Sequence, residues 1–176
     1  MQRLRPRAEL RFLPNLLSLS RLFLAALFVP ADREERGVLI VVAALTDFFD
    51  GWIARRSNNA TRWGALLDPI GDRAFVVVAV ATFLYSGALS LGGFLVMISR
   101  DLMTVVGFLV ARLIPSLRPV EFKARLAGKI VTVLQLITLL LLVFSPERVR
   151  PMLWLVGITS AWAIVDYTVA LWRARA

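Results

Sequence analysis

The sequence contains no cysteine and no histidine. Without cysteine the chain cannot form disulfides, use a thiolate as a nucleophile or bind zinc through sulfur. Without histidine it lacks the side chain that most often transfers protons near neutral pH and the commonest nitrogen ligand of metals. Any metal must therefore be bound through oxygen, which favours hard cations such as magnesium, manganese or calcium.

Charged residues are few relative to apolar ones, because 59% of the 176 residues are hydrophobic. Soluble domains average about 45–50% apolar residues. The formal net charge of +9 is compatible with binding to nucleic acid or to the anionic surface of a membrane. The hydrophobicity favours the membrane, and we expect no nucleic-acid partner.

The apolar residues form six stretches of a length suited to crossing a bilayer, which takes about 20 residues per helix. Their approximate bounds are Leu13–Val29, Val38–Ala54, Ala65–Tyr85, Leu91–Leu113, Leu126–Phe144 and Met152–Leu171. We therefore predict an all-α polytopic membrane protein with six transmembrane helices, folded as a single domain over residues 1–176. Residues 1–12 carry four arginines and are expected to form a short basic amphipathic segment beside the membrane.

Lysine and arginine are distributed unequally between the two sides of this topology. The N-terminal segment, the second-to-third connection, the fourth-to-fifth connection and the C-terminus are basic. The other two polar connections mix their arginines with acidic residues. By the positive-inside rule, both termini are expected in the cytoplasm.

Four aspartates interrupt the apolar sequence, at Asp47, Asp50, Asp68 and Asp72. Carboxylates at membrane depth are costly and usually have a function. At about 100° per residue, the first two share one face of a helix and the last two share one face of the next helix. Two such helices joined by a short connection would form an acidic cleft, where bound divalent cations would relieve the repulsion between carboxylates.

Small and basic residues accompany the aspartates. Gly51, Ala54 and Gly64 leave room for a flat ring or a phosphate to approach the helix backbone. Arg55 and Arg56 would place guanidinium groups at the mouth of the cleft, where they suit phosphate oxygens. A metal site, arginines and small residues in one cleft together indicate that the ligand is a nucleotide diphosphate. Helix packing by a single aspartate, or an ion or proton pathway, are the alternatives.

The complete frame, Asp-x2-Asp-Gly-x2-Ala-Arg-x8-Gly-x3-Asp-x3-Asp, resembles the signature of the CDP-alcohol phosphotransferase family. The resemblance implies a six-helix membrane bundle, usually a homodimer, that moves a phosphatidyl or related group from a CDP-linked donor to an acceptor hydroxyl and releases CMP. It further implies that the four aspartates bind two divalent cations, Mg²⁺ or Mn²⁺, and that Asp72 is also the general base. The implied contacts to the cytidine diphosphate are Gly51, Ala54, Arg55, Thr61 and Gly64.

Three further segments resemble bacterial phosphatidylglycerophosphate synthases and eukaryotic-type cardiolipin synthases, namely Pro14–Arg21, Ile98–Asp101 and Gly128–Gln135. The basic residues expected to bind a phosphate on the acceptor are Arg21, Arg100, Arg125 and Lys129. Arg100 has the alternative of pairing with Asp101 or Asp166. The alternative explanation for Arg125 and Lys129 is that their side chains extend to the membrane surface and bind anionic lipid.

The resulting hypothesis is an enzyme that transfers the phosphatidyl group of CDP-diacylglycerol to glycerol 3-phosphate. Phosphatidylglycerol is the second candidate acceptor, which would yield cardiolipin, and inositol phosphate is a more distant third. A cation- or proton-coupled transporter is the alternative from another class. The expected partners are CDP-diacylglycerol, a phosphate-bearing alcohol, the lipid bilayer and a second copy of the chain. The expected location is a bacterial-type inner membrane, with the active site facing the cytoplasm.

Overall fold

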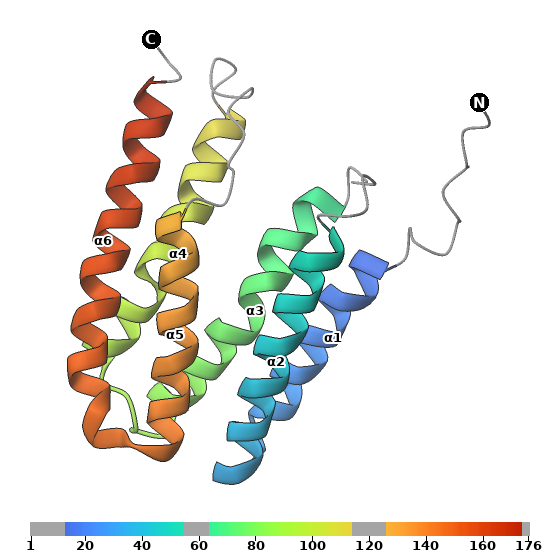
Figure 1. Ribbon diagram of the computed structural model, residues 1–176, viewed down its shortest axis with the longest axis vertical. Helices are drawn as coiled ribbons and strands as arrows, with labels where there is room; N and C mark the ends of the chain where they lie inside the picture. Colours follow the sequence, from blue (N-terminus) through green and yellow to red (C-terminus); the bar gives the residue numbers. More distant parts are fainter. Residues whose placement is uncertain (1–12, 55–63, 114–125, 174–176) are drawn as a thin grey trace. The chain divides into compact units, whose positions relative to one another are not determined.

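The computed structural model describes residues 13–54, 64–113 and 126–173, and this part of the chain contains six α-helices and one short 3₁₀ helix (Figure 1). The elements are α1 (Leu13–Phe28), α2 (Arg33–Ala54), α3 (Gly64–Tyr85), α4 (Leu91–Leu113), α5 (Leu126–Phe144), η3 (Pro146–Arg148) and α6 (Val149–Arg173). The prediction of an all-α fold with six helices is confirmed. The basic segment predicted at residues 1–12 lies outside the described residues.

Helix α2 begins before its apolar stretch because Asp32 and Glu35 form a capping box. The backbone N–H of Glu35 donates to Oδ1 of Asp32 at 2.9 Å, and the backbone N–H of Asp32 donates to Oε2 of Glu35 at 3.0 Å. Such reciprocal bonds satisfy N–H groups that have no partner in the first turn of a helix. The charged run Arg33–Arg36 is therefore helical, although hydropathy alone does not predict it.

Helix α6 also begins earlier than predicted, at Val149 instead of Met152. Pro151 lies in the first turn of this helix, where a missing N–H costs no intrahelical hydrogen bond. The 3₁₀ turn of η3 leads directly into it, with the N–H of Arg148 donating to the carbonyl of Ser145 at 3.0 Å.

The helices fall into two compact units, Met1–Ala79 and Val80–Ala176. In the first unit α1 packs against α2, and Phe28 of α1 contacts Phe75 of α3 edge to face, with ring centroids 5.6 Å apart. In the second unit α6 packs against both α4 and α5, and Figure 1 shows α5 and α6 running side by side.

Helix α4 approaches α6 closely at Gly93. A Cβ atom at this position would lie 2.6 Å from Cδ1 of Leu89 and 3.1 Å from Cδ1 of Leu153, which belongs to α6. Small residues at helix crossings allow such close approach in membrane proteins. Gly93 therefore sets the distance between α4, which carries Arg100, and α6.

The second unit buries polar side chains and exposes apolar ones. Its buried polar residues are Arg100, Asp101, Gln135, Thr138 and Ser160. Large apolar side chains on the outside of the same helices include Leu95, Leu102, Trp154, Ile158, Trp162 and Val165. Apolar side chains such as Val131, Leu139 and Val156 are buried as well. The many large apolar side chains on the outside are typical of helices surrounded by lipid.

Several threonine hydroxyl groups on the helices donate to carbonyls of their own helix. Thr104 donates to the carbonyl of Arg100 at 2.8 Å, and Thr138 donates to that of Leu134 at 2.7 Å. Thr159 does the same one turn back, to Leu155, at 2.7 Å. Because each hydroxyl is satisfied locally, these residues can lie in an apolar environment without a further partner.

Two helical segments of the described chain are long and apolar enough to cross a membrane by length and composition, Leu126–Phe144 and Pro146–Val169. Leu19–Phe28 and Arg73–Tyr85 are shorter apolar helical stretches. The six predicted spans thus correspond to six helices, of which these two satisfy the length and composition criterion within residues 13–54, 64–113 and 126–173.

We predict that Gly93→Val destabilises the protein while Gly92→Val does not. The side chain added at Gly93 would collide with Leu89 and Leu153, whereas a Cβ at Gly92 has only Oγ of Ser90 within reach, at 4.0 Å. Overpacking of this kind costs about 1–3 kcal/mol. Thermal unfolding of both variants in the same detergent checks the prediction, and equal unfolding temperatures would contradict the close approach of α4 and α6.

Candidate active site

The aspartate frame lies on two helices that follow one another in the chain. Asp47 and Asp50 are three residues apart near the end of α2, and Asp68 and Asp72 are four residues apart near the start of α3. Because both segments are helical, each pair occupies one helical face, as its spacing predicted. The side chains of Asp50, Asp68 and Asp72 lie outside the part of the structure that is described.

The carboxylate of Asp47 forms an ion pair with Arg21. Nη2 of Arg21 lies 3.1 Å from Oδ1 of Asp47, which joins α1 to α2. The side chain of Arg21 is only 5% exposed, while that of Asp47 is 47% exposed. The sequence predicts that Arg21 binds the phosphate of an acceptor, and the structure places its guanidinium against Asp47, a predicted metal ligand.

The four carboxylates fit a hard divalent cation by the chemistry of their atoms. They offer only oxygen, the chain holds no cysteine or histidine, and magnesium and manganese prefer oxygen ligands. Asp47 remains half exposed although it is paired with Arg21, so its carboxylate is accessible to a ligand. The frame is therefore compatible with the predicted divalent cations.

The residues predicted to contact the cytidine diphosphate surround the aspartates in the chain. Gly51 and Ala54 belong to the end of α2, and Gly64 is the first residue of α3. Arg55 and Thr61 fall between these helices, outside the described residues. The small residues are thus on the same helix ends as the aspartates.

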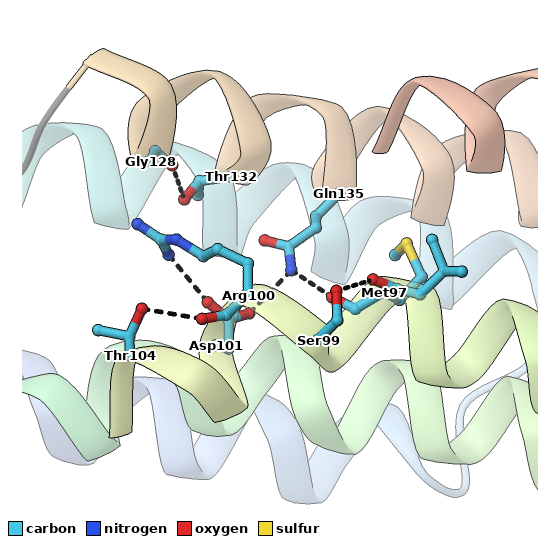
Figure 2. Close-up of polar contacts among 9 residues, drawn as sticks. Met97, Ser99, Arg100, Asp101, Thr104, Gly128, Thr132 and Gln135 are labelled. Carbon is cyan, nitrogen blue, oxygen red and sulfur yellow. Dashed lines mark hydrogen bonds and ion pairs between the residues drawn. The ribbon is translucent and has the colours of Figure 1, made fainter. Parts of the chain in front are cut away.

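Arg100, which the sequence predicts to bind the phosphate of the acceptor, is buried among polar side chains. Its residue is 3% exposed, and Nη1 lies 2.9 Å from Oδ1 of Asp101, so one of the two expected pairings is observed (Figure 2). Nε of Arg100 is buried and has no hydrogen-bond partner among residues 13–54, 64–113 and 126–173. Lys129 is exposed, and Arg125 lies outside the described residues.

Helix α5 leaves space for the guanidinium of Arg100 at Gly128. A Cβ atom there would collide with Nη2 of Arg100 and would lie 2.8 Å from the hydroxyl of Tyr167. The guanidinium carbon of Arg100 lies 6.0 Å from the centroid of the Tyr167 ring. Arg100 is therefore enclosed by α4, α5 and α6 of the second unit.

Gln135 completes this polar cluster from the next turns of α5. Its Nε2 donates to Oδ2 of Asp101 at 2.8 Å and to the backbone carbonyl of Met97 at 2.6 Å (Figure 2). The sequence indicates Asp101 as an alternative partner of Arg100, but no role for Gln135 or Tyr167 is predicted from it. The spacing of Gly128, Thr132 and Gln135 by four and three residues was the available signal, since it places them on one face of a helix.

Comparison with known proteins identifies the family. A model of the CDP-alcohol phosphatidyltransferase family matches residues 11–172. The chain therefore belongs to the CDP-alcohol phosphatidyltransferase family. Together with the exposed apolar helices, this membership indicates a membrane protein and an enzyme.

Several relatives share one name, CDP-diacylglycerol--glycerol-3-phosphate 3-phosphatidyltransferase. The protein from Pectobacterium atrosepticum is 30% identical over 174 residues, which cover 88% of this chain and 92% of the relative. The protein from Aquifex aeolicus is 37% identical over 107 residues, 56% of this chain and 60% of the relative. The protein from Escherichia coli K12 is 41% identical over 75 residues, 39% of this chain and 41% of the relative.

We predict that Gly128→Ala destabilises the protein by roughly 1–3 kcal/mol, because the new methyl group would displace the guanidinium of Arg100. Gly157→Ala is the matched control, since its Cβ would meet only Cγ1 of Val96 at 3.6 Å, an ordinary contact. Thermal unfolding should show a lower transition for Gly128→Ala and an unchanged or higher one for Gly157→Ala. The same shift in both variants would argue against a close contact between Gly128 and Arg100.

Proposed function

We propose that the protein transfers the phosphatidyl group of CDP-diacylglycerol to a hydroxyl of glycerol 3-phosphate and releases CMP. The observation that carries this proposal is the similarity to the Pectobacterium protein of that name across 92% of the relative's length. The complete aspartate frame on α2 and α3 supports it, because transfer between phosphate esters needs charge neutralisation at the reacting phosphate.

In this proposal Asp47, Asp50, Asp68 and Asp72 hold two divalent cations, Mg²⁺ or Mn²⁺. The bound cations supply charge neutralisation to the diphosphate of the donor and to the departing CMP. Arg21 pairs with Asp47 at 3.1 Å and links this carboxylate to α1. The cytidine diphosphate contacts Gly51, Ala54, Arg55, Thr61 and Gly64, whose small side chains or polar groups suit a nucleotide.

Asp72 is the proposed general base. Its carboxylate takes the proton of the acceptor hydroxyl, and the hydroxyl oxygen attacks the phosphorus that carries the diacylglycerol. The bond between this phosphorus and the oxygen that links it to CMP breaks as the new ester bond forms. CMP leaves with that oxygen and its electron pair, so the displacement needs no covalent intermediate with the protein.

The acceptor carries its own phosphate, for which Arg21, Arg100, Arg125 and Lys129 are the proposed ligands. The properties of Arg100 favour it most, because a buried guanidinium with one neutralising partner retains N–H groups that suit phosphate oxygens. The burial of Arg21 against Asp47 favours a position beside the cations for this residue.

We further propose that all six helices cross the membrane and that the chain forms a homodimer. Both termini and the ends of α2 and α3 that carry the aspartates face the cytoplasm, and residues 1–12 lie along the membrane surface. The basic connections support this orientation. The exposed apolar side chains of α1, α2, α4 and α6 support contact with lipid.

One observation favours a second acceptor. Asp101 follows Arg100 in this chain. An aspartate at this position resembles the cardiolipin synthases, whereas phosphatidylglycerophosphate synthases more often have glutamate. Phosphatidylglycerol also carries a phosphate, so the cluster around Arg100 suits either acceptor. A transporter, the alternative from another class, is not favoured, because the chain belongs to a family of transferases.

We expect the purified protein to release CMP from CDP-diacylglycerol when glycerol 3-phosphate and Mg²⁺ or Mn²⁺ are present. Chelation of the divalent cation should abolish this release. Mass spectrometry of the lipid product should identify phosphatidylglycerophosphate. As a control for the acceptor, phosphatidylglycerol and inositol phosphate are offered in turn. Dominant formation of cardiolipin would refute glycerol 3-phosphate as the acceptor.

We expect Asp72→Asn to lower CMP release by at least about 100-fold, because an amide cannot accept the proton of the acceptor hydroxyl. Glu147→Gln is the control, since this acid is 69% exposed in η3 and contacts only Arg148 among the described ion pairs. Binding of Mn²⁺, followed by electron paramagnetic resonance, should weaken in Asp72→Asn as well. Full turnover of Asp72→Asn would rule out its assignment as the base.

A further inference from the structure

The carboxylate of Asp101 is held by two partners from different helices. Oδ1 lies 2.9 Å from Nη1 of Arg100 on α4, and Oδ2 accepts a hydrogen bond from Nε2 of Gln135 on α5 at 2.8 Å. Figure 2 shows Asp101 between these two side chains. Because both oxygens are engaged, the rotation of the carboxylate is restricted from both sides.

Arg100 and Asp101 are adjacent in a helix, so their side chains do not naturally face one another. Their ion pair requires the arginine to bend toward the carboxylate, and it requires the carboxylate to stay in place. Gln135 supplies this restraint from the opposite helix. It is 1% exposed, and its second hydrogen bond, 2.6 Å to the carbonyl of Met97, anchors the amide to the backbone of α4.

The ion pair leaves part of the guanidinium available. Asp101 binds Nη1, Nε has no hydrogen-bond partner in the described part of the chain, and Nη2 extends to the space left by Gly128. Buried polar groups are usually satisfied, and an orphaned donor on a charged group is costly. A guanidinium that is neutralised on one side and unsatisfied on another is suited to an anionic ligand.

A purely structural pair is the alternative explanation. It would tie α4 to α5 and would need no particular orientation of the remaining N–H groups. The orphaned Nε argues against it, because a purely structural pair would be more favourable if this buried donor also had a polar partner.

We propose that Asp101 and Gln135 are positioning residues that hold the guanidinium of Arg100 in the orientation that binds the phosphate of the acceptor. The inference rests on the proposed function, since it takes the acceptor to carry a phosphate. Asp101 offsets the charge of the buried arginine, and Gln135 fixes Asp101. Neither residue contacts the acceptor itself.

The test uses Gln135→Met and Asp101→Asn in the full chain. Methionine matches the volume of glutamine but removes both hydrogen bonds, and asparagine removes the negative charge at constant volume. Both variants should raise the KM for glycerol 3-phosphate by about tenfold, because the lost bond involves a charged group. The kcat and the KM for CDP-diacylglycerol should stay within about twofold, since uniform binding of one substrate is lost.

Thr138→Val is the matched control. Thr138 is also fully buried on α5, about one turn beyond Gln135, and its hydroxyl donates only within its own helix, to the carbonyl of Leu134 at 2.7 Å. This variant loses a buried hydrogen bond without touching Asp101, so its KM for glycerol 3-phosphate should not change. An equal rise in Thr138→Val, or equal losses for both substrates in Gln135→Met, would support the structural explanation and overturn ours.

Direct binding of glycerol 3-phosphate, measured by isothermal titration calorimetry, separates this inference from the proposed reaction. A wild-type protein that binds glycerol 3-phosphate but forms no phosphatidylglycerophosphate would refute the reaction. Weaker binding in both variants would then still support the positioning role. Unchanged affinity in the variants would refute that role, whichever lipid the enzyme makes. If Gln135→Met does not fold, Asp101→Asn alone tests the positioning role, because asparagine has nearly the same size as aspartate.

Discussion

A charged side chain inside an apolar helical protein needs a partner, and this constraint explains the ion pairs that the two buried arginines Arg21 and Arg100 form. Arg100 is neutralised by Asp101, and Arg21 is neutralised by Asp47. Each pair has a different consequence. The Arg21 pair joins α1 to α2 beside the aspartate frame, whereas the Arg100 pair needs Gln135 from α5 to hold its carboxylate. Buried ion pairs are weak sources of stability. In our proposal, the pair of Arg100 with Asp101 orients the remaining N–H groups of the guanidinium.

Hydropathy predicted the six helices well because each apolar stretch is bounded by polar or turn-forming residues. The ends that it missed depend on local hydrogen bonds instead. Asp32 and Glu35 extend α2 through a charged turn, and Pro151 is tolerated in the first turn of α6. Gly87, with a φ of 74°, allows the chain to turn between α3 and α4. These effects act over a few residues, so a closer reading of capping patterns would have found them.

The candidate site was predictable only in part, for a physical reason. Spacing within one helix determines which residues share a face, so the pairing of Asp47 with Asp50 and of Asp68 with Asp72 follows from the sequence. Contacts between helices depend on packing, which spacing does not determine. The contact of Arg21 with Asp47 and that of Gln135 with Asp101 are of this kind. A buried glutamine in an apolar helix was nevertheless a usable signal, since it must find a partner.

The exposed apolar side chains of the second unit have a practical consequence for protein engineering. The polar cluster of Arg100, Asp101 and Gln135 lies inside, and residues such as Leu95, Leu102 and Trp162 lie outside. The two sets occupy different faces of the helices, so they can be changed independently. Replacing the outer residues with glutamate and lysine alters only the groups that meet the solvent. A water-soluble analogue of these helices could thus retain the inner cluster and be studied without detergent.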